Sequence, residues 1–179
     1  HELRTPLTTI SGYAELLSSG MLQKPEDATE FGRKILAESR RLLTLIEDII
    51  RLSRLDEGVR GEVTPVDLTA LIQHCVQKLT PAAQNAQVSI SASGNDPVLI
   101  SGDHALLEEM LTNLLENGIK YNHAGGYVRA RAEMADGRAV VTVADNGVGI
   151  APEDQQRVFE RFYRVDKSRS KQTGGTGLG

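Results

Sequence analysis

Apolar residues recur at helical spacing through the first third of the chain. The seam alternates steps of four and three and consists of Leu3, Leu7, Ile10, Ala14 and Leu17. This spacing is typical of a coiled-coil-like helix. Pro6 lies within the pattern and predicts a bend, because it has no amide hydrogen to donate to the carbonyl of Glu2. The segment from Gly20 to Pro25 breaks the period and predicts a turn.

A second long helix is expected from about Glu26 to Asp56, and it carries two apolar stripes. One stripe consists of Phe31, Ile35, Leu42, Leu45, Ile49 and Leu52, and the neighbouring stripe of Leu36, Leu43 and Ile50. One antiparallel helical hairpin cannot bury both stripes. Two hairpins that pair into a dimeric four-helix bundle would bury them. Packing of the second stripe against the rest of the same chain remains the alternative.

The pattern changes after the hairpin. Residues 59–66 contain glycine and proline and predict a linker. Beyond them we expect, in order, a helix over 67–79, strands over 87–92 and 98–101, a helix capped by Asp103 and ending near Lys120, and a β-hairpin of 126–134 and 138–144 around Asp136-Gly137. The sequence therefore predicts a multidomain α and α+β protein: a helical hairpin over 1–58 and a two-layer α/β sandwich over 67–179.

Composition narrows the function classes. The chain has 179 residues, 40% of them hydrophobic and 25% charged, as in ordinary globular proteins. A net charge of −4 argues against nucleic-acid binding, and no apolar stretch is long enough to span a membrane, so we expect no membrane contact by this segment. Cys75 is the single cysteine, which excludes an internal disulfide; its apolar helical face predicts a buried thiol.

The first six residues, His1 to Pro6, hold an imidazole, a carboxylate and a hydroxyl. In a helix, His1 and Thr5 share one face, with Glu2 beside the imidazole. A neutral imidazole nitrogen can attack phosphorus when a carboxylate takes or holds the proton on the other nitrogen. The segment is therefore a candidate nucleophilic site.

Three polar or glycine-rich segments follow in the last third of the chain, at 113–117, 145–149 and 174–179. Asn113 and Asn117 are four residues apart, and their amide oxygens are hard ligands suited to Mg²⁺. Asp145 ends an apolar strand, where an acceptor can take the exocyclic amino group of adenine. Together with the opening hexapeptide and the aromatic and basic segment over 159–164, these segments resemble the H, N, G1, F and G2 boxes of sensor histidine kinases of bacterial two-component systems.

The resemblance covers essentially the whole chain and implies an ATP- and Mg²⁺-dependent protein-histidine kinase. It implies that His1 is autophosphorylated and that an aspartate of a response regulator receiver domain then accepts the phosphoryl group. Glu2 would accept the proton of His1, and Thr5 would support the reverse phosphatase activity. The full-length protein would be a homodimer anchored in the bacterial cell membrane, and this chain a cytoplasmic fragment of it that stops inside its last glycine box.

The resemblance also implies a nucleotide site. Its residues would be Asn113, Asn117, Lys120, Tyr121, Asp145, Gly147, Gly149, Arg164, Thr176, Gly177 and Leu178. Asn117 would hold Mg²⁺, Asn113 and Lys120 would face the phosphates, and Tyr121 would lie beside the nucleotide. Asp145 would bind adenine, and Arg164 would contact the terminal phosphate. The amides of Gly177 and Leu178 would lie at a helix N-terminus.

Two other functions fit parts of this pattern. A gyrase-type ATPase shares the nucleotide-binding fold, but it usually has a glutamate where this chain has Asn113, and an amide cannot act as a base. A catalytically inactive dimeric scaffold would not need Asn117, Asp145 and the glycine segments.

Overall fold

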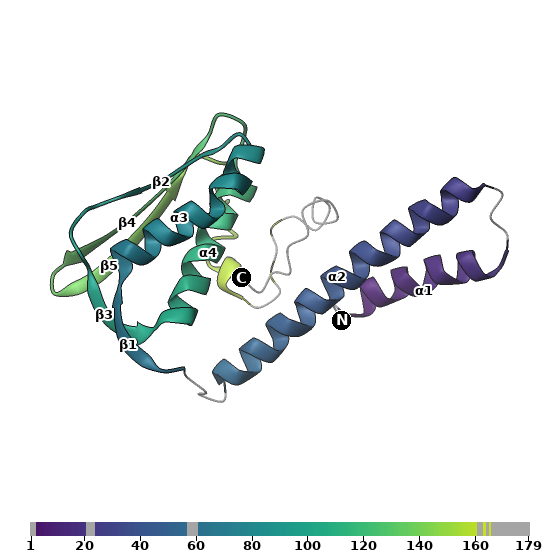
Figure 1. Cartoon of the computed structure of the whole chain (residues 1–179), viewed down its shortest axis with the longest axis horizontal. Helices are drawn as coiled ribbons and strands as arrows, with labels where there is room; N and C mark the ends of the chain where they lie inside the picture. Colours follow the sequence, from purple (N-terminus) through teal and green to yellow (C-terminus); the bar gives the residue numbers. More distant parts are fainter. Residues whose placement is uncertain (1–2, 21–23, 57–60, 161–162, 164, 166–179) are drawn as a thin grey trace. The chain divides into compact units, whose positions relative to one another are not determined.

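The computed structural model describes residues 3–20, 24–56 and 61–160, together with Tyr163 and Val165. These residues belong to two compact units, one built on residues 1–59 and one that spans Arg60–Gln156. The first is a helical hairpin and the second an α/β unit (Figure 1).

The hairpin consists of α1 (Arg4–Ser18) and α2 (Pro25–Asp56), which pack against each other as predicted (Figure 1). Gly20 has a φ of +68°, a left-handed conformation that suits glycine at the end of a helix. Pro6 falls in the first turn of α1 as described, where a missing amide hydrogen costs no helical hydrogen bond.

The two apolar stripes of α2 have different surroundings. The first is half-buried or buried along its length; Leu45 is 2% exposed and the rings of Phe31 and Tyr13 are 5.2 Å apart. The second is exposed, with Leu36 at 50% and Leu43 at 60% of full accessibility. One hairpin therefore covers one stripe, as the sequence predicts. Within the described residues, none of the helices combines the length and hydrophobicity that crossing a bilayer requires.

The predicted linker over 59–66 is wrong in its second half. Residues Val63–Asp67 form strand β1, which pairs antiparallel with β3 (Leu99–Asp103). The proline at 65 suggested a linker, but this ladder has only two strands, and proline is tolerated in such edge positions.

The rest of the α/β unit is a two-layer sandwich. Strands β2 (Ser89–Ser93), β4 (Tyr127–Ala135) and β5 (Arg138–Asp145) form a sheet in the order β2-β4-β5, with β2 parallel and β5 antiparallel to β4. Helices α3 (Leu68–Asn85) and α4 (His104–Lys120) cover one face of it (Figure 1). Asp136 and Gly137 form the predicted turn, both with positive φ. A short 3₁₀ helix, η1 (Arg157–Phe159), follows this unit in the sequence and is grouped with the hairpin.

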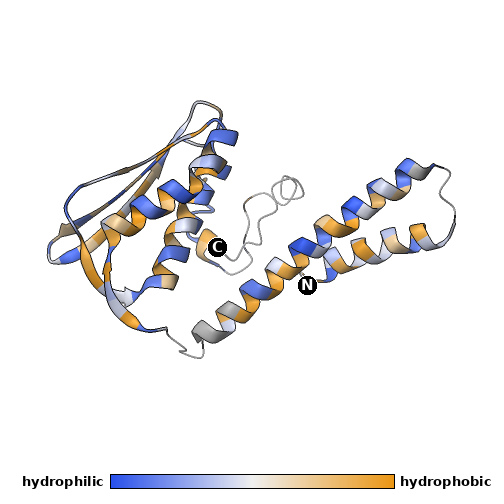
Figure 2. Ribbon diagram, viewed as in Figure 1, coloured by the Kyte–Doolittle hydropathy of each residue, from blue (hydrophilic) through white to orange (hydrophobic). Residues whose placement is uncertain are grey.

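The core of the sandwich lies between the helices and the sheet. Apolar residues of α3, α4 and β4 face one another there, and polar residues occupy the outer surfaces (Figure 2). Helix α3 continues six residues past the predicted end at Leu79, because Ala83 still adds to the buried face. Cys75 is completely buried, as predicted, and this burial raises the pKa of its thiol.

Candidate functional site

The nucleophilic segment lies only partly within the described residues. His1 and Glu2 lie outside them, so the arrangement of imidazole and carboxylate stays a prediction. Thr5 lies in the first turn of α1 with an exposed side chain, and its carbonyl accepts a hydrogen bond from Thr9 Oγ1 at 3.1 Å. The Thr5 hydroxyl is thus accessible from solvent.

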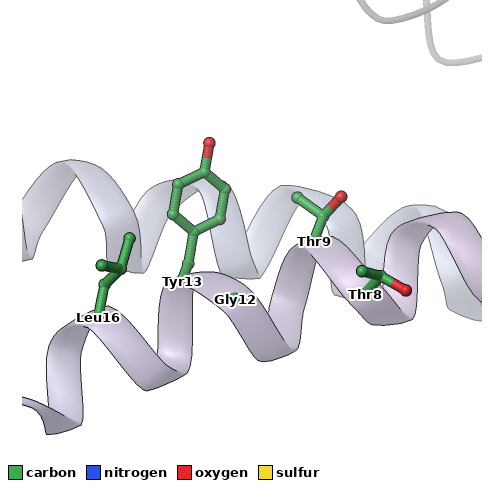
Figure 3. A pocket seen from close by; sticks show the side chains of 5 residues that line it. All are labelled: Thr8, Thr9, Gly12, Tyr13 and Leu16. Atoms are coloured by element: carbon green, nitrogen blue, oxygen red, sulfur yellow. The ribbon is translucent and has the colours of Figure 1, made fainter.

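A shallow hollow lies further along α1. It is lined by Thr8, Thr9, Gly12, Tyr13 and Leu16 (Figure 3). A Cβ at position 12 would meet no atom within 4 Å, so the absence of a side chain there opens the helix surface. The ammonium group of Lys34 lies 5.4 Å from the centre of the Tyr13 ring and 2.7 Å from the Glu30 carboxylate. The sequence analysis missed this hollow, for which Gly12 is the only signal.

Helix α4 carries the two carboxamides predicted for the nucleotide site. Asp103 caps this helix, as predicted, by accepting hydrogen bonds from the amides of Ala105 and Leu106. Leu111 and Leu115 are fully buried, which fixes the rotation of the helix on the sheet. Asn113 is consequently half-buried and Asn117 is exposed, one turn apart.

Gly118 explains how α4 comes close to the end of β5. A Cβ at this position would lie 3.0 Å and 3.1 Å from the two methyl groups of Val128 and 3.7 Å from the Cβ of Asp145. The nearest neighbour of Gly118 is therefore a core side chain of β4. The close packing brings Asp145 next to the residue that follows Asn117.

The loop after β5 is held to the end of α4. The amide of Val148 donates to the carbonyl of Tyr121 at 3.0 Å, and the amide of Gly147 donates to Asp145 Oδ1 at 2.8 Å. A Cβ on Gly147 would overlap the Tyr121 carbonyl oxygen, and Gly149 has a φ of +69°. Gly147 therefore allows a close approach to the protein's own backbone, and Gly149 allows a turn.

The end of α4 also presents a cation and an aromatic ring. The ammonium group of Lys120 lies 5.3 Å from the centre of the Tyr121 ring, and Tyr121 is 46% exposed. Asp145 is exposed beside them. A polar amide, a carboxylate, an ammonium group and an accessible ring thus come together from α4 and the end of β5.

Three further residues support this region, and two of them, Asn122 and Asn146, were not predicted from the sequence. Asn122 Nδ2 donates to the carbonyls of Gly118 and Tyr127, both at 3.0 Å, and so closes the end of α4. Asn146 Oδ1 accepts from the amide of Tyr127 at 2.7 Å. The ring nitrogens of His123 lie 3.2 Å and 3.1 Å from the carbonyl oxygens of Ala124 and Asn146, and a protonated imidazole donates to both.

The opposite end of α4 has a different charge arrangement. Glu108 lies 2.8 Å from the Lys78 ammonium group and 3.8 Å from His74 Nε2, which joins α4 to α3. The hydrogen bond from Lys78 lowers the pKa of Glu108, and the same bond raises the pKa of Lys78. Histidines 74 and 104 are exposed.

Several predicted site residues lie outside the described part of the chain: Arg164, Thr176, Gly177 and Leu178. Among the residues that the structure describes, no group of three or more His, Cys, Asp or Glu side chains could hold a metal ion. Asn117 stays the Mg²⁺ ligand that the resemblance implies. Its exposed position and oxygen donor fit an ion that keeps several waters and needs few protein groups.

Two known families match two different parts of the chain, the helical hairpin and the α/β unit. Residues 1–58 match the His Kinase A (phospho-acceptor) domain, and residues 102–179 match the family described as Histidine kinase-, DNA gyrase B-, and HSP90-like ATPase. The sensor-like histidine kinase SenX3 of Mycolicibacterium smegmatis is 40% identical over all of this chain and 47% of its own length. The chain thus spans about half of this relative.

Solved structures agree. The histidine kinase AdeS of Acinetobacter baumannii superposes with a TM-score of 0.75 at 26% identity, over 99% of this chain and 82% of that one. Full-length ShkA in complex with AMPPNP superposes with a TM-score of 0.71 at 30% identity, over 99% of this chain and 37% of that one. The chain therefore belongs to the sensor histidine kinases and carries their phospho-acceptor segment followed by their ATPase-type domain.

Proposed function

We propose that this chain is the catalytic core of an ATP-dependent protein-histidine kinase that phosphorylates His1 and then an aspartate of a response regulator receiver domain. The observation that carries the proposal is the junction of α4 and β5, where Asn117, Tyr121 and Asp145 come together. A gyrase-type ATPase would leave the match of residues 1–58 to a phospho-acceptor domain without a role.

In the proposed reaction, one ring nitrogen of His1 attacks the γ-phosphorus of ATP. The new N–P bond forms as the bond to the β–γ bridging oxygen breaks, and ADP leaves. Glu2 takes the proton from the other ring nitrogen, which keeps phosphohistidine neutral at the ring. Thr5, one turn along the exposed face of α1, would position water for the reverse dephosphorylation of the regulator.

The chain's own residues would hold the nucleotide as follows. Asp145 would accept a hydrogen bond from the amino group of adenine. Its Oδ1 also accepts a hydrogen bond from the amide of Gly147, which fixes the loop. Tyr121 would lie beside the nucleotide, and Lys120 and Asn113 would face its phosphates. Bound Mg²⁺, held through Asn117, would neutralise phosphate charge. The remaining predicted residues would complete the site: Gly149, Arg164, Thr176, Gly177 and Leu178.

The proposed kinase is a homodimer through its hairpin. The exposed stripe of α2, with Leu43 at 60% accessibility, supports this assignment. The hollow at Gly12 lies on the helix that follows His1 and would be available to a receiver domain (Figure 3).

Incubation with γ-labelled ATP tests the proposal. The label should be acid-labile and alkali-stable, as expected of an N–P bond, and His1→Gln should abolish it while leaving ATP binding intact. His1 should be preceded by a short segment in this assay, so that its backbone nitrogen is an amide and not a free terminal amine. ATP binding without any label would favour the inactive scaffold.

Binding measurements test the site separately. Asn117→Ala should weaken Mg·ATP binding in calorimetry, and Asp145→Ala should reduce the preference for ATP over GTP. Unchanged affinity in both variants would overturn the site assignment.

A further inference from the structure

The two carboxylate oxygens of Asp103 serve two different segments of the chain. Oδ1 accepts hydrogen bonds from the amides of Ala105 at 3.0 Å and Leu106 at 3.2 Å, which caps α4. Oδ2 accepts a hydrogen bond from the amide of Gly61 at 2.8 Å, 42 residues earlier in the sequence. Capping α4 therefore uses only one of the two oxygens.

Gly61 lies where the chain enters the α/β unit, between the end of α2 at Asp56 and the start of β1 at Val63. A Cβ at this position would overlap Oδ2 of Asp103. The contact thus requires glycine at 61 for its space and a carboxylate oxygen at 103 as its acceptor.

Helix α3 provides an internal comparison. Asp67 caps it in the same way, with Oδ1 accepting from the amides of Thr69 at 2.9 Å and Ala70 at 3.4 Å. The same Oδ1 also accepts from Val98 at 3.2 Å. The bond from Gly61 to a second carboxylate oxygen is therefore an addition that a helix cap does not need.

We propose that Asp103 is a positioning residue, which holds Gly61 at the start of the α/β unit against the first turn of α4. This inference rests on the proposed kinase function. Phosphoryl transfer requires that the nucleotide unit reach His1 through the connecting segment. The effective concentration of two tethered partners depends on the length and freedom of the tether. The tether here is the segment between Asp56 and the first residue held by the α/β unit. Release of Gly61 adds Gly61 and Glu62 to this segment.

The proposal separates transfer from binding. Asn113 and Asn117 lie about three and four turns beyond Asp103 on a helix that stays capped through Oδ1. Loss of the Gly61–Asp103 bond should therefore slow phosphorylation of His1 and leave nucleotide affinity unchanged. A purely structural role would lower both together.

Two substitutions remove the bond from opposite sides. In Asp103→Asn the side-chain oxygen still caps α4, since asparagine is an equally good N-cap, while the amide nitrogen cannot accept from Gly61. Gly61→Ala removes the space for Oδ2. The connecting segment between Asp56 and its first anchored residue grows from four residues to six, so we expect each to slow His1 phosphorylation about twofold and to leave Mg·ATP affinity unchanged. The double variant should be no slower than either single one, because both remove one bond.

Asp67→Asn and Glu62→Ala are the matched controls and should leave the rate unchanged. A parallel loss of affinity and rate, an additive double variant, or unchanged rates would overturn the proposal. Amide hydrogen exchange gives a readout that does not depend on kinase activity. In Asp103→Asn the Gly61 amide should exchange faster while Ala105 and Leu106 stay protected, and unchanged exchange at Gly61 would refute the bond itself. Absence of phosphorylation in the unaltered chain would instead count against the proposed function.

Discussion

The hairpin and the α/β unit differ in how much of their apolar surface they bury within themselves. Of the described side chains of α1 and α2, only Pro6 and Leu45 are fully buried, while Leu7 and Leu43 keep more than half of their surface exposed. The α/β unit encloses a continuous core between its two helices and its sheet. Since burial of apolar surface is the main favourable term in folding, the α/β unit is self-sufficient, and the open stripe of the hairpin fits the proposed homodimer.

The largest expected effect tests the self-sufficient core. Leu115 is fully buried, so Leu115→Ala should lower the free energy of unfolding of the α/β unit by about 2–5 kcal/mol. Leu114 is its neighbour in sequence and is 45% exposed, so Leu114→Ala should cost much less. Denaturant unfolding of both variants measures the difference, and equal losses would contradict the assigned core.

The second prediction tests the open surface of the hairpin. Leu43→Asp places a charge on the exposed stripe, and a buried leucine contributes about 1.5–3 kcal/mol per copy. The dissociation constant of the dimer should therefore rise about a hundredfold or more. Analytical ultracentrifugation measures it, with Thr44→Asp as control, at the exposed neighbouring position about 100° around α2. A dimer that tolerates Leu43→Asp would place the interface elsewhere.

The sequence could predict what depends on local periodicity. The 3.6-residue repeat predicts both stripes of α2 and the buried face around Cys75. Asp103 is a residue type that favours helix N-caps, and Asp136-Gly137 a pair that favours tight turns. Contacts between distant segments left no such signal. Strand β1 was missed because Pro65 suggested a linker, and only its pairing with β3 makes it a strand.

The candidate site shows the same limit. Asn113, Asn117 and Asp145 could be chosen from their motifs, but the supporting bonds of Asn122 and Asn146 depend on where α4 ends against β4. Asparagine is common in turns, so its identity alone does not reveal such a role.

The third prediction concerns the loop that the self-sufficient unit holds against α4. In Gly147→Ala the new Cβ would collide with the Tyr121 carbonyl and break the bond from Val148. The loop that follows Asp145 would move and its bond to the Asp145 carboxylate would change, so we expect about a tenfold loss of ATP affinity, which corresponds to 1.4 kcal/mol. Gly137→Ala, in a turn with φ of +74°, strains the backbone elsewhere and should reduce stability but not affinity. Calorimetry that finds equal affinity losses for the two variants would refute a specific role for Gly147.

The smallest expected effect concerns the exposed seam between α3 and α4. The Lys78 hydrogen bond lowers the pKa of Glu108 below its ordinary value of 4.5, with a smaller contribution from the charges of His74 and His104. A lowered carboxyl pKa means that the stabilisation is fully present above the ordinary value and is lost as the pH falls through the lowered one.

Lys78→Met should therefore reduce the melting temperature slightly at neutral pH and flatten its fall as the pH drops below about 4.5, the ordinary value for Glu108. The effect should be small, because exposed ion pairs are screened by solvent. Gln77→Met, at the exposed neighbouring position, should leave the pH profile unchanged. Melting curves of the three proteins between neutral and acidic pH measure this difference. If Lys78→Met keeps the original profile, the bond between Lys78 and Glu108 adds nothing to the joining of α3 and α4, and their buried faces alone hold the two helices together.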